Sequence, residues 1–262
     1  MVDRGLTMDN DDDPCCWICL ESGPHAESGS PLRRDCSCRG LSGHAHIDCL
    51  SRYARRKSSL TGTADLAAFG RPWEVCPNCT QPYRNEVAID LSSAFIDFVD
   101  KGEHKTGMAK LAARRLRLVS FGTYLMSMSR SGAPSKYLED AKETSRAVIA
   151  MIDEIRAEEG RISQSVQILE TDAYSVLGMA HLQQGTQEGA AEAVLYFTKC
   201  REICERIGHR IGTTVAESNI SLSLAKSGQS RVDTRDNLNK YDTMYQVRRR
   251  EKEGGRFLPR PS

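Results

Sequence analysis

Cysteine and histidine residues between positions 16 and 79 form four close pairs. The pairs are Cys16 and Cys19, Cys36 and Cys38, His46 and Cys49, and Cys76 and Cys79. Thiolate and imidazole are the ligands of Zn²⁺, and two ligands separated by one to four residues can reach one ion from a single tight turn. Because zinc takes four ligands in a tetrahedron, eight ligands predict two closed structural sites. Neither ion is then catalytic, since a catalytic zinc keeps one position for water. Isolated buried cysteines or half-cystines would not be expected to show this regular pairing.

Two neighbouring residues compete with predicted ligands. Cys15 could replace Cys16, and His44 could replace His46. The spacing of two residues that is usual inside such a pair favours Cys16, and only His46 is separated by two residues from Cys49. We therefore expect His44 at the surface or beside the site as a hydrogen-bonding neighbour.

The order of four cysteines, one histidine and three cysteines resembles the RING-CH (RING-variant) zinc finger of ubiquitin ligases. One residue stands inside the second pair and seven precede the histidine, and the intervening segments are similar too: Trp17-Ile18, Arg39-Gly40, Ile47-Asp48 and Trp73-Glu74-Val75. The resemblance implies a cross-brace fold with interleaved sites. On that pattern the first zinc takes Cys16, Cys19, His46 and Cys49, and the second takes Cys36, Cys38, Cys76 and Cys79.

The resemblance also implies a function without a catalytic residue in this chain. Such a finger binds a ubiquitin-conjugating enzyme that carries ubiquitin, and promotes transfer to a substrate lysine by proximity and orientation. The positions that match the docking groove of related fingers are Ile18, Trp73 and Pro77. For Trp73 an ordinary core position is the equal alternative. Many active RING fingers carry Arg or Lys after the last ligand, where this chain has Thr80, with Arg84 as a substitute.

Two other functions compete with the ligase. A PHD-type reader of histone tails also uses four cysteines, one histidine and three cysteines, but it has four or five residues before the histidine and its tryptophan two before the seventh ligand. Here seven residues precede His46, and Trp73 lies three before Cys76. The second alternative is a zinc-binding adaptor that does not bind the conjugating enzyme.

Composition bounds the compartment and the partners. With 36 Lys and Arg against 35 Asp and Glu, the net charge is +1, so no global field favours nucleic acid or a membrane surface. No apolar run approaches the ~20 residues of a membrane span, and no signal pattern is visible at the N-terminus. Thiolate ligands also fit a reducing compartment. We expect a cytoplasmic protein, with a nuclear location left open by the basic C-terminal end.

The elements that must position the ligands are small. An acidic, solvated tail is predicted for residues 1–14 and the zinc finger for 15–84, which is too short of apolar residues to stay folded without its metal. The segment after Cys49 has apolar residues at helical spacing, which predicts a short helix over 50–57. Residues 58–72 contain Gly and Ser, and a flexible loop is expected there.

The rest of the chain shows helical periodicity throughout. Helices are predicted over 87–99, 108–129, 135–155, 161–183, 188–207 and 211–226, with a weaker one over 234–250, and glycines at their ends. The segments around Gly178 and Phe197 resemble the tetratricopeptide pattern, in which small residues let paired helices approach closely. The expected fold is therefore a small zinc-stabilised cross-brace domain followed by an all-α domain of helical hairpins over 85–245, which would bind the substrate. A basic tail is expected over 246–262.

Overall fold

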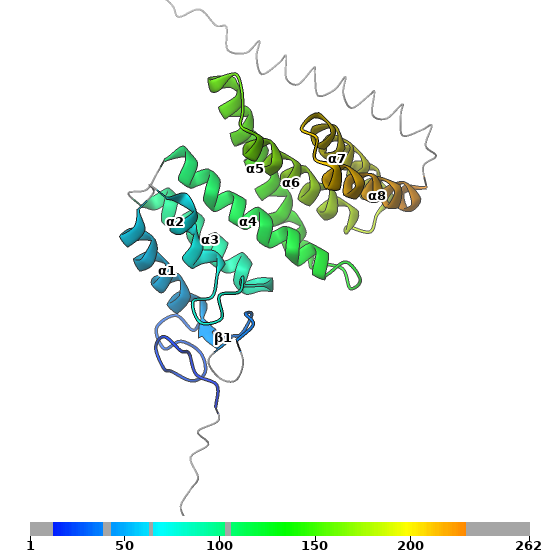
Figure 1. The fold of residues 1–262 in the computed structure, drawn as a ribbon. Coiled ribbons are helices and arrows are strands. Elements are labelled where there is room, and N and C mark those ends of the chain that lie inside the picture. Colours follow the sequence, from blue (N-terminus) through cyan, green and yellow to red (C-terminus); the bar gives the residue numbers. More distant parts are fainter. Residues whose placement is uncertain (1–12, 39–42, 63–64, 103–105, 229–262) are drawn as a thin grey trace, which may run out of the picture. The chain divides into compact units, whose positions relative to one another are not determined.

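The computed structural model describes residues 13–38, 43–62, 65–102 and 106–228 (Figure 1). The chain packs as two compact units, Met1–Tyr124 and Leu125–Ser262. Most of the predicted acidic tail, the weak helix over 234–250 and the basic tail lie outside the described residues.

The first unit combines a two-stranded sheet with helices. Its elements are β1 (Leu32–Arg33), β2 (Ala45–His46), α1 (Ile47–Thr61), α2 (Leu66–Glu74), α3 (Asn85–Lys101) and α4 (Gly107–Ser127), the last of which continues beyond Tyr124. The two strands are antiparallel, with Leu32 opposite His46. In the described residues of the chain these are the only strands that pair into a sheet.

The prediction of a flexible loop over 58–72 was wrong. Helix α1 runs on to Thr61, and α2 begins at Leu66. The carboxylate of Asp65 caps α2 by accepting hydrogen bonds from the backbone N–H groups of Ala67 and Ala68. An Asp at this position is a strong helix start signal. Gly62 and Gly70 nevertheless favour a loop over this segment. The contacts that stabilise the apolar side of α2 come from other helices, which the local sequence does not reveal.

Helix α2 is held by an aromatic cluster. Trp73 stacks on Phe95 of α3 with ring centroids 5.0 Å apart, and Phe69 packs against the same ring at 5.5 Å. Phe69, Trp73 and Phe95 are all buried, and the cluster continues into Ala109 and Ala113 of α4. Helix α3 and the first part of α4 therefore belong to the same compact unit as the ligand pairs.

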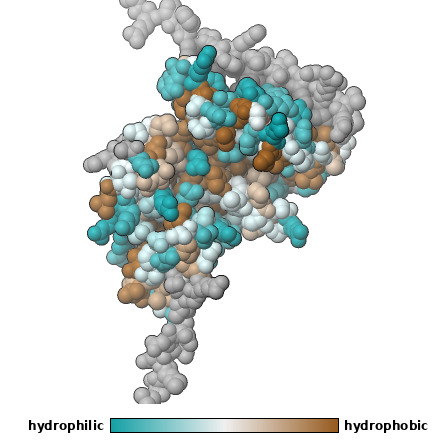
Figure 2. Space-filling view, viewed as in Figure 1, coloured by the Kyte–Doolittle hydropathy of each residue, from teal (hydrophilic) through white to brown (hydrophobic). Residues whose placement is uncertain are grey.

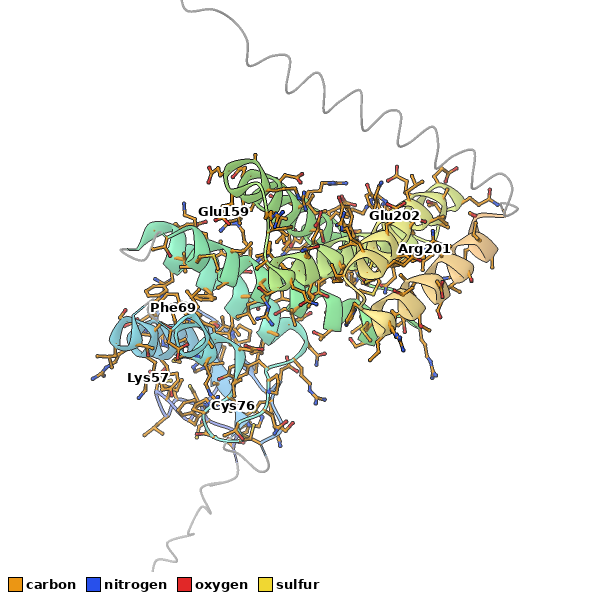
Figure 3. All side chains as sticks on the ribbon, turned by 45° about the horizontal axis from the view of Figure 1, so that its top comes forward. Lys57, Phe69, Cys76, Glu159, Arg201 and Glu202 are labelled. Atoms are coloured by element: carbon orange, nitrogen blue, oxygen red, sulfur yellow. The ribbon has the colours of Figure 1, made fainter. Side chains whose placement is uncertain are left out.

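This packing differs from the boundary expected after residue 84. The zinc-ligand segment has a small apolar core of its own, and the aromatic side chains of its helix α2 pack against α3 and α4, which follow it. Phe69 and Cys76, labelled in Figure 3, mark the helical and the ligand-bearing parts of the unit. The range 15–84 stays a proposal for the zinc module itself.

The buried Ser58 connects α1 to α2 through hydrogen bonds. Its hydroxyl donates a hydrogen bond to the carbonyl of Phe69 at 2.7 Å and accepts one from the indole Nε1–H of Trp73 at 2.8 Å. Replacing Ser58 by alanine would leave the buried indole N–H of Trp73 without its acceptor and would remove one hydrogen bond from the Phe69 carbonyl, so we expect a loss of about 1–3 kcal/mol in the free energy of unfolding. Ser59→Ala, at an exposed position of the same helix, is the matched control and should change stability by less than about 0.5 kcal/mol. Chemical denaturation of the zinc-loaded protein measures both, and equal stabilities of the two variants would contradict the role of Ser58.

The second unit is a series of helices packed in sequence order. The helices that lie wholly within it are α5 (Ser135–Glu159), α6 (Gln164–Leu182), α7 (Gln187–Arg206) and α8 (Arg210–Ser227). They match the predicted segments within a few residues at each end. Each helix packs on the next one along the chain. The predicted all-helical region is thereby confirmed for the described residues.

Glycine determines both the ends and the spacing of these helices. Gly160 and Gly228 end α5 and α8 in the left-handed conformation that an L side chain adopts only at a cost. Inside α6, a Cβ atom on Gly178 would lie 2.9 Å from the ring of Phe197 in α7. The absence of a side chain at Gly178 thus lets α6 and α7 approach closely, as the helical-hairpin pattern predicts.

The surface is mixed in character. Figure 2 shows hydrophilic and hydrophobic residues interspersed on the visible face. Among the described residues, no helix combines the length and the apolar character that crossing a membrane requires.

Candidate metal centre

The first ligand group brings together the first and the third of the four close pairs. Cys16, Cys19, His46 and Cys49 place one ligand atom each so that all four lie within 4.8 Å of one another. The Nδ1 atom of His46 is 3.4 Å from the Sγ of Cys19 and 3.8 Å from the Sγ of Cys49. A tetrahedron with Zn–S bonds of about 2.3 Å and Zn–N bonds of about 2.0 Å has edges of about 3.5–3.8 Å. The spacing therefore suits a zinc ion.

The second group has the same character with four thiols. Cys36, Cys38, Cys76 and Cys79 also lie within 4.8 Å of one another through their Sγ atoms, and the Sγ atoms of Cys38 and Cys76 are 3.7 Å apart. The two groups interleave along the chain. The first and third pairs form one group, and the second and fourth pairs form the other. This is the cross-brace arrangement, and both groups suit zinc.

Two ligand pairs sit on equivalent turns. The backbone N–H of Leu20 donates to the carbonyl of Cys16 at 2.8 Å, and that of Thr80 donates to the carbonyl of Cys76 at 2.9 Å. Leu20 and Thr80 both have a positive φ, 65° and 57°. Each turn folds a Cys-x-x-Cys segment so that both of its thiols face the same point, at the cost of one residue in the left-handed region.

The third pair is positioned by a strand and a helix. His46 ends β2 and precedes the first turn of α1, which carries Cys49. The Nε2–H of His46 donates to the carbonyl of Gly23 at 2.8 Å, a tautomer that leaves the Nδ1 lone pair facing the thiols. Such a hydrogen bond fixes the ring orientation of a metal-binding histidine. The ring of His25, which is buried, packs edge-on against His46 with centroids 5.2 Å apart.

The second group is tied to the start of α3. The backbone N–H of Arg84 and the side-chain amide of Asn85 both donate to Asp35, at 2.9 Å and 3.1 Å. Asp35 immediately precedes Cys36, so the position of that ligand depends on where α3 begins. Arg33 adds an ion pair with Glu86 at 2.6 Å, between side chains that are 30% and 41% exposed, and this pair contributes little by itself.

Backbone hydrogen bonds prepare two of the thiols to ionise. Burial raises the pKa of Cys16, but N–H groups of Cys19, His46 and Ile18 outweigh it and lower the pKa to about 7. The pKa of Cys79 is likewise lowered to about 7 by backbone N–H groups that overcome desolvation. The pKa of Cys49 is raised to about 12, mainly by burial and to a smaller extent by the neighbouring thiols. N–H groups directed at sulfur are what a thiolate ligand needs, so the donor set fits a bound cation.

Comparison with known proteins gives one match. Residues 16–64 match the family model of the RING-variant domain, a stretch that contains six of the eight ligands. No curated protein and no solved structure matches the chain.

The N-terminal zinc finger is a RING-variant domain.

This domain is typical of ubiquitin ligases. The last two ligands, Cys76 and Cys79, lie beyond the matched residues, and it is the geometry that places them with Cys36 and Cys38. The match thus covers less than one fifth of the chain, and the helices that follow are known from the structure alone.

The structure distinguishes Cys16 from Cys15 and His46 from His44 as candidate ligands. Neither Cys15 nor His44 belongs to a ligand group among the described residues. Cys15 instead pairs through its backbone with Ser22, across the first ligand turn. The carbonyl of His44 accepts a hydrogen bond from the backbone of Trp17. The buried His25 was missed by the sequence reasoning, because no close pair marks it.

The predicted docking residues of the RING-variant domain fall into two groups. Ile18 is partly buried and Pro77 is exposed, one on each Cys-x-x-Cys turn. Trp73 is only 1% exposed and lies in the aromatic cluster, so its place is the core alternative that the sequence left open. Leu20, which is 75% exposed, lies on the same turn as Ile18 and adds apolar surface that the sequence did not single out.

Proposed function

We propose that this protein is a RING-type ubiquitin-protein ligase. Its RING-variant domain binds two structural zinc ions and docks a ubiquitin-conjugating enzyme, and ubiquitin passes from that enzyme to a substrate lysine. The chain supplies no nucleophile. Its contribution is to hold the thioester and the lysine in a reactive arrangement, which lowers the entropic cost of the encounter. The helical region after the domain binds the substrate or another partner.

The observation that carries the proposal is the pair of interleaved ligand groups. All eight ligands lie in two groups of four, so zinc bound there has no position left for water and acts by shaping the surface. Zinc is the expected ion because tetrahedral sites of thiolate and imidazole select it. The two Cys-x-x-Cys turns carry the partly buried Ile18 and the exposed Pro77, and these residues form the proposed docking surface.

Thr80 bears on how active the ligase is. It is exposed at the position that follows the last ligand, and its hydroxyl donates to the carbonyl of Cys79 at 2.7 Å. Arg84 is exposed four residues later, where its backbone begins α3. We propose that Arg84 takes the bridging role between ubiquitin and the conjugating enzyme that a basic residue after the last ligand would have.

Replacing Ile18 by alanine should weaken ubiquitin transfer without loss of metal. Truncating an apolar anchor in a docking surface costs roughly 1–2 kcal/mol, so we expect autoubiquitination with purified components to be about ten-fold slower. Zinc content should remain at two ions per chain. Leu60→Ala is the matched control, since Leu60 is an apolar residue that is 77% exposed at the end of α1 and should leave transfer unchanged. Full transfer by the Ile18 variant would remove that residue from the docking surface.

The same assay separates the competing functions. A zinc-binding adaptor would hold two ions yet give no transfer with any of a panel of conjugating enzymes. A PHD-like reader would instead bind unmodified or methylated histone-tail peptides, which fluorescence anisotropy measures directly. The RING-variant match favours the ligase over the reader.

A further inference from the structure

A third group of metal-binding side chains adjoins the first ligand group. Cys19, Glu21 and His25 place one sulfur, one carboxylate oxygen and one ring nitrogen within 4.8 Å of one another. Cys19 already belongs to the first group of four, whereas Glu21 and His25 belong to neither group of four. Thiolate, carboxylate and imidazole are all ligands of Zn²⁺, and three protein ligands with one position left for water form an open zinc site.

The backbone folds this short segment around the first ligand group. The N–H of Cys16 donates to the carbonyl of Glu21 at 3.0 Å, which closes the turn that carries Cys19. The carbonyl of Gly23 accepts the hydrogen bond from the Nε2–H of His46, and the ring of His25 packs edge-on against His46. The three side chains are therefore held beside a site that binds zinc.

His25 is held with one ring nitrogen available to a metal ion. The residue is 6% exposed, and its Nδ1 lies 3.3 Å from the hydroxyl oxygen of Ser28. That hydroxyl donates its proton to the carboxylate of Asp48, so its oxygen accepts from the Nδ1–H of His25. The resulting tautomer carries a lone pair on Nε2, for which the described residues provide no hydrogen-bond partner. Such a hydrogen bond at the other nitrogen is what orients a metal-binding histidine.

Glu21 loses its hydrogen bond when the first site fills with zinc. The thiol of Cys19 donates to the carboxylate of Glu21 over 3.6 Å. A cysteine binds zinc as a thiolate, so this proton leaves when the ion binds. Three thiolates and one neutral imidazole around Zn²⁺ also leave a net negative charge. The carboxylate then faces a partly negative sulfur, and a cation bound to both atoms removes the repulsion.

We propose that Cys19, Glu21 and His25 bind a third zinc ion once both structural sites are filled. Cys19 bridges two ions, since a zinc-bound thiolate keeps lone pairs for a second cation. Glu21 and the Nε2 of His25 complete the protein ligands, and a mixed set of sulfur, nitrogen and oxygen suits zinc. With three protein ligands in place of four, this ion is the weakest bound of the three, so desalted protein keeps two.

Native mass spectrometry of the full chain tests the site. Protein that has been loaded with two zinc ions and desalted is titrated with Zn²⁺, and the wild type should take up one further ion. Glu21→Gln and His25→Phe should each bind that ion at least about ten-fold more weakly while retaining the first two, because each lacks one ligand. Phenylalanine keeps a ring against His46. Ser28→Ala should weaken the third ion about ten-fold, since it removes only the partner that orients His25.

The matched control is Glu27→Gln, which makes the same change of charge close by. Glu27 has a side chain that is 81% exposed and pairs with Arg52, so its variant should bind the third ion like the wild type. Co²⁺ added in place of the third zinc reports on sulfur, because a cobalt ion bound to thiolate absorbs in the near ultraviolet by charge transfer. The wild type with two zinc ions and one cobalt ion should show this absorption.

Three results would overturn the proposal. The first is the absence of a third ion at any zinc concentration at which the protein stays soluble. The second is an equal loss in Glu21→Gln and Glu27→Gln, and the third is bound cobalt without the thiolate absorption. Either of the last two would identify an ion held only by surface carboxylates.

Metal content is the readout, so the result does not depend on the proposed ligase function. A third ion in protein that transfers no ubiquitin would support this site and contradict the ligase alone. Transfer by protein that never takes up a third ion would support the ligase and contradict this site.

Discussion

Replacing Cys36 by serine is expected to release one zinc ion and to unfold the structure around it. Cys36 is one of four thiols in the second group, and its neighbour Asp35 anchors the start of α3. A structural zinc site contributes about 10–16 kcal/mol of binding free energy, which exceeds the total stability of most domains. Serine is a poor ligand for zinc, so most of that free energy is lost. Zinc content should fall from two ions to one or none, and ubiquitin transfer should be abolished.

The matched control is Cys15→Ser, which removes a thiol directly beside the first group but outside it. It should retain two zinc ions and full transfer, because Cys15 contributes only backbone pairing. Native mass spectrometry and a metal-release assay measure the zinc, and circular dichroism measures the loss of helix. A Cys36 variant that keeps two ions and its thermal transition would contradict the assignment of the second site.

Replacing Trp73 by alanine should destabilise the first unit by about 3–5 kcal/mol. The indole is buried against Phe95 and Phe69, and its N–H is paired with Ser58, so truncation leaves a large cavity and removes one of the two hydrogen bonds of the Ser58 hydroxyl. Denaturant unfolding of zinc-loaded protein measures the loss. The variant should bind two zinc ions at low temperature, since Trp73 is not a ligand.

A docking role for Trp73 makes the opposite prediction. A tryptophan that contacts only a partner could be truncated with little effect on stability, and transfer would fall at every temperature. Trp73→Phe sharpens the comparison, because phenylalanine retains most of the apolar volume and loses only the indole N–H. We expect its stability to lie between those of the wild type and the alanine variant, with transfer close to wild type. Normal stability of the alanine variant together with lost transfer would return Trp73 to the docking surface.

The sequence predicts the ligand groups well because their chemistry is local. A pair of ligands for one ion must lie within one turn of backbone, so spacing alone reveals Cys16 with Cys19 and Cys76 with Cys79. Which pairs share an ion is a long-range property. It followed from the family resemblance and agrees with the distances in the structure. The helices of the second unit were predictable for the same local reason, since their periodicity ends at residues such as Gly160 that tolerate a left-handed backbone.

Helix α2 could not be predicted in this way. It is nine residues long, contains Gly70 and Pro72, and has low intrinsic helix propensity. Its stability comes from partners far along the chain, chiefly Ser58 of α1 and Phe95 of α3. The same contacts explain why the first unit extends beyond the predicted zinc finger. Tertiary packing determines both the presence of α2 and the extent of the first unit, and the periodicity of a sequence does not reveal tertiary packing.

The central claim is that two bound zinc ions shape a surface that activates a ubiquitin-conjugating enzyme. Ubiquitin transfer by the purified full chain, measured with a panel of conjugating enzymes before chelation, after chelation and after zinc is restored, tests it most directly. We predict transfer by protein that holds two zinc ions, loss of transfer when the metal is removed, and recovery when zinc is restored. Protein that carries two zinc ions and yet accelerates no enzyme of the panel would contradict it, as would transfer that survives complete removal of the metal.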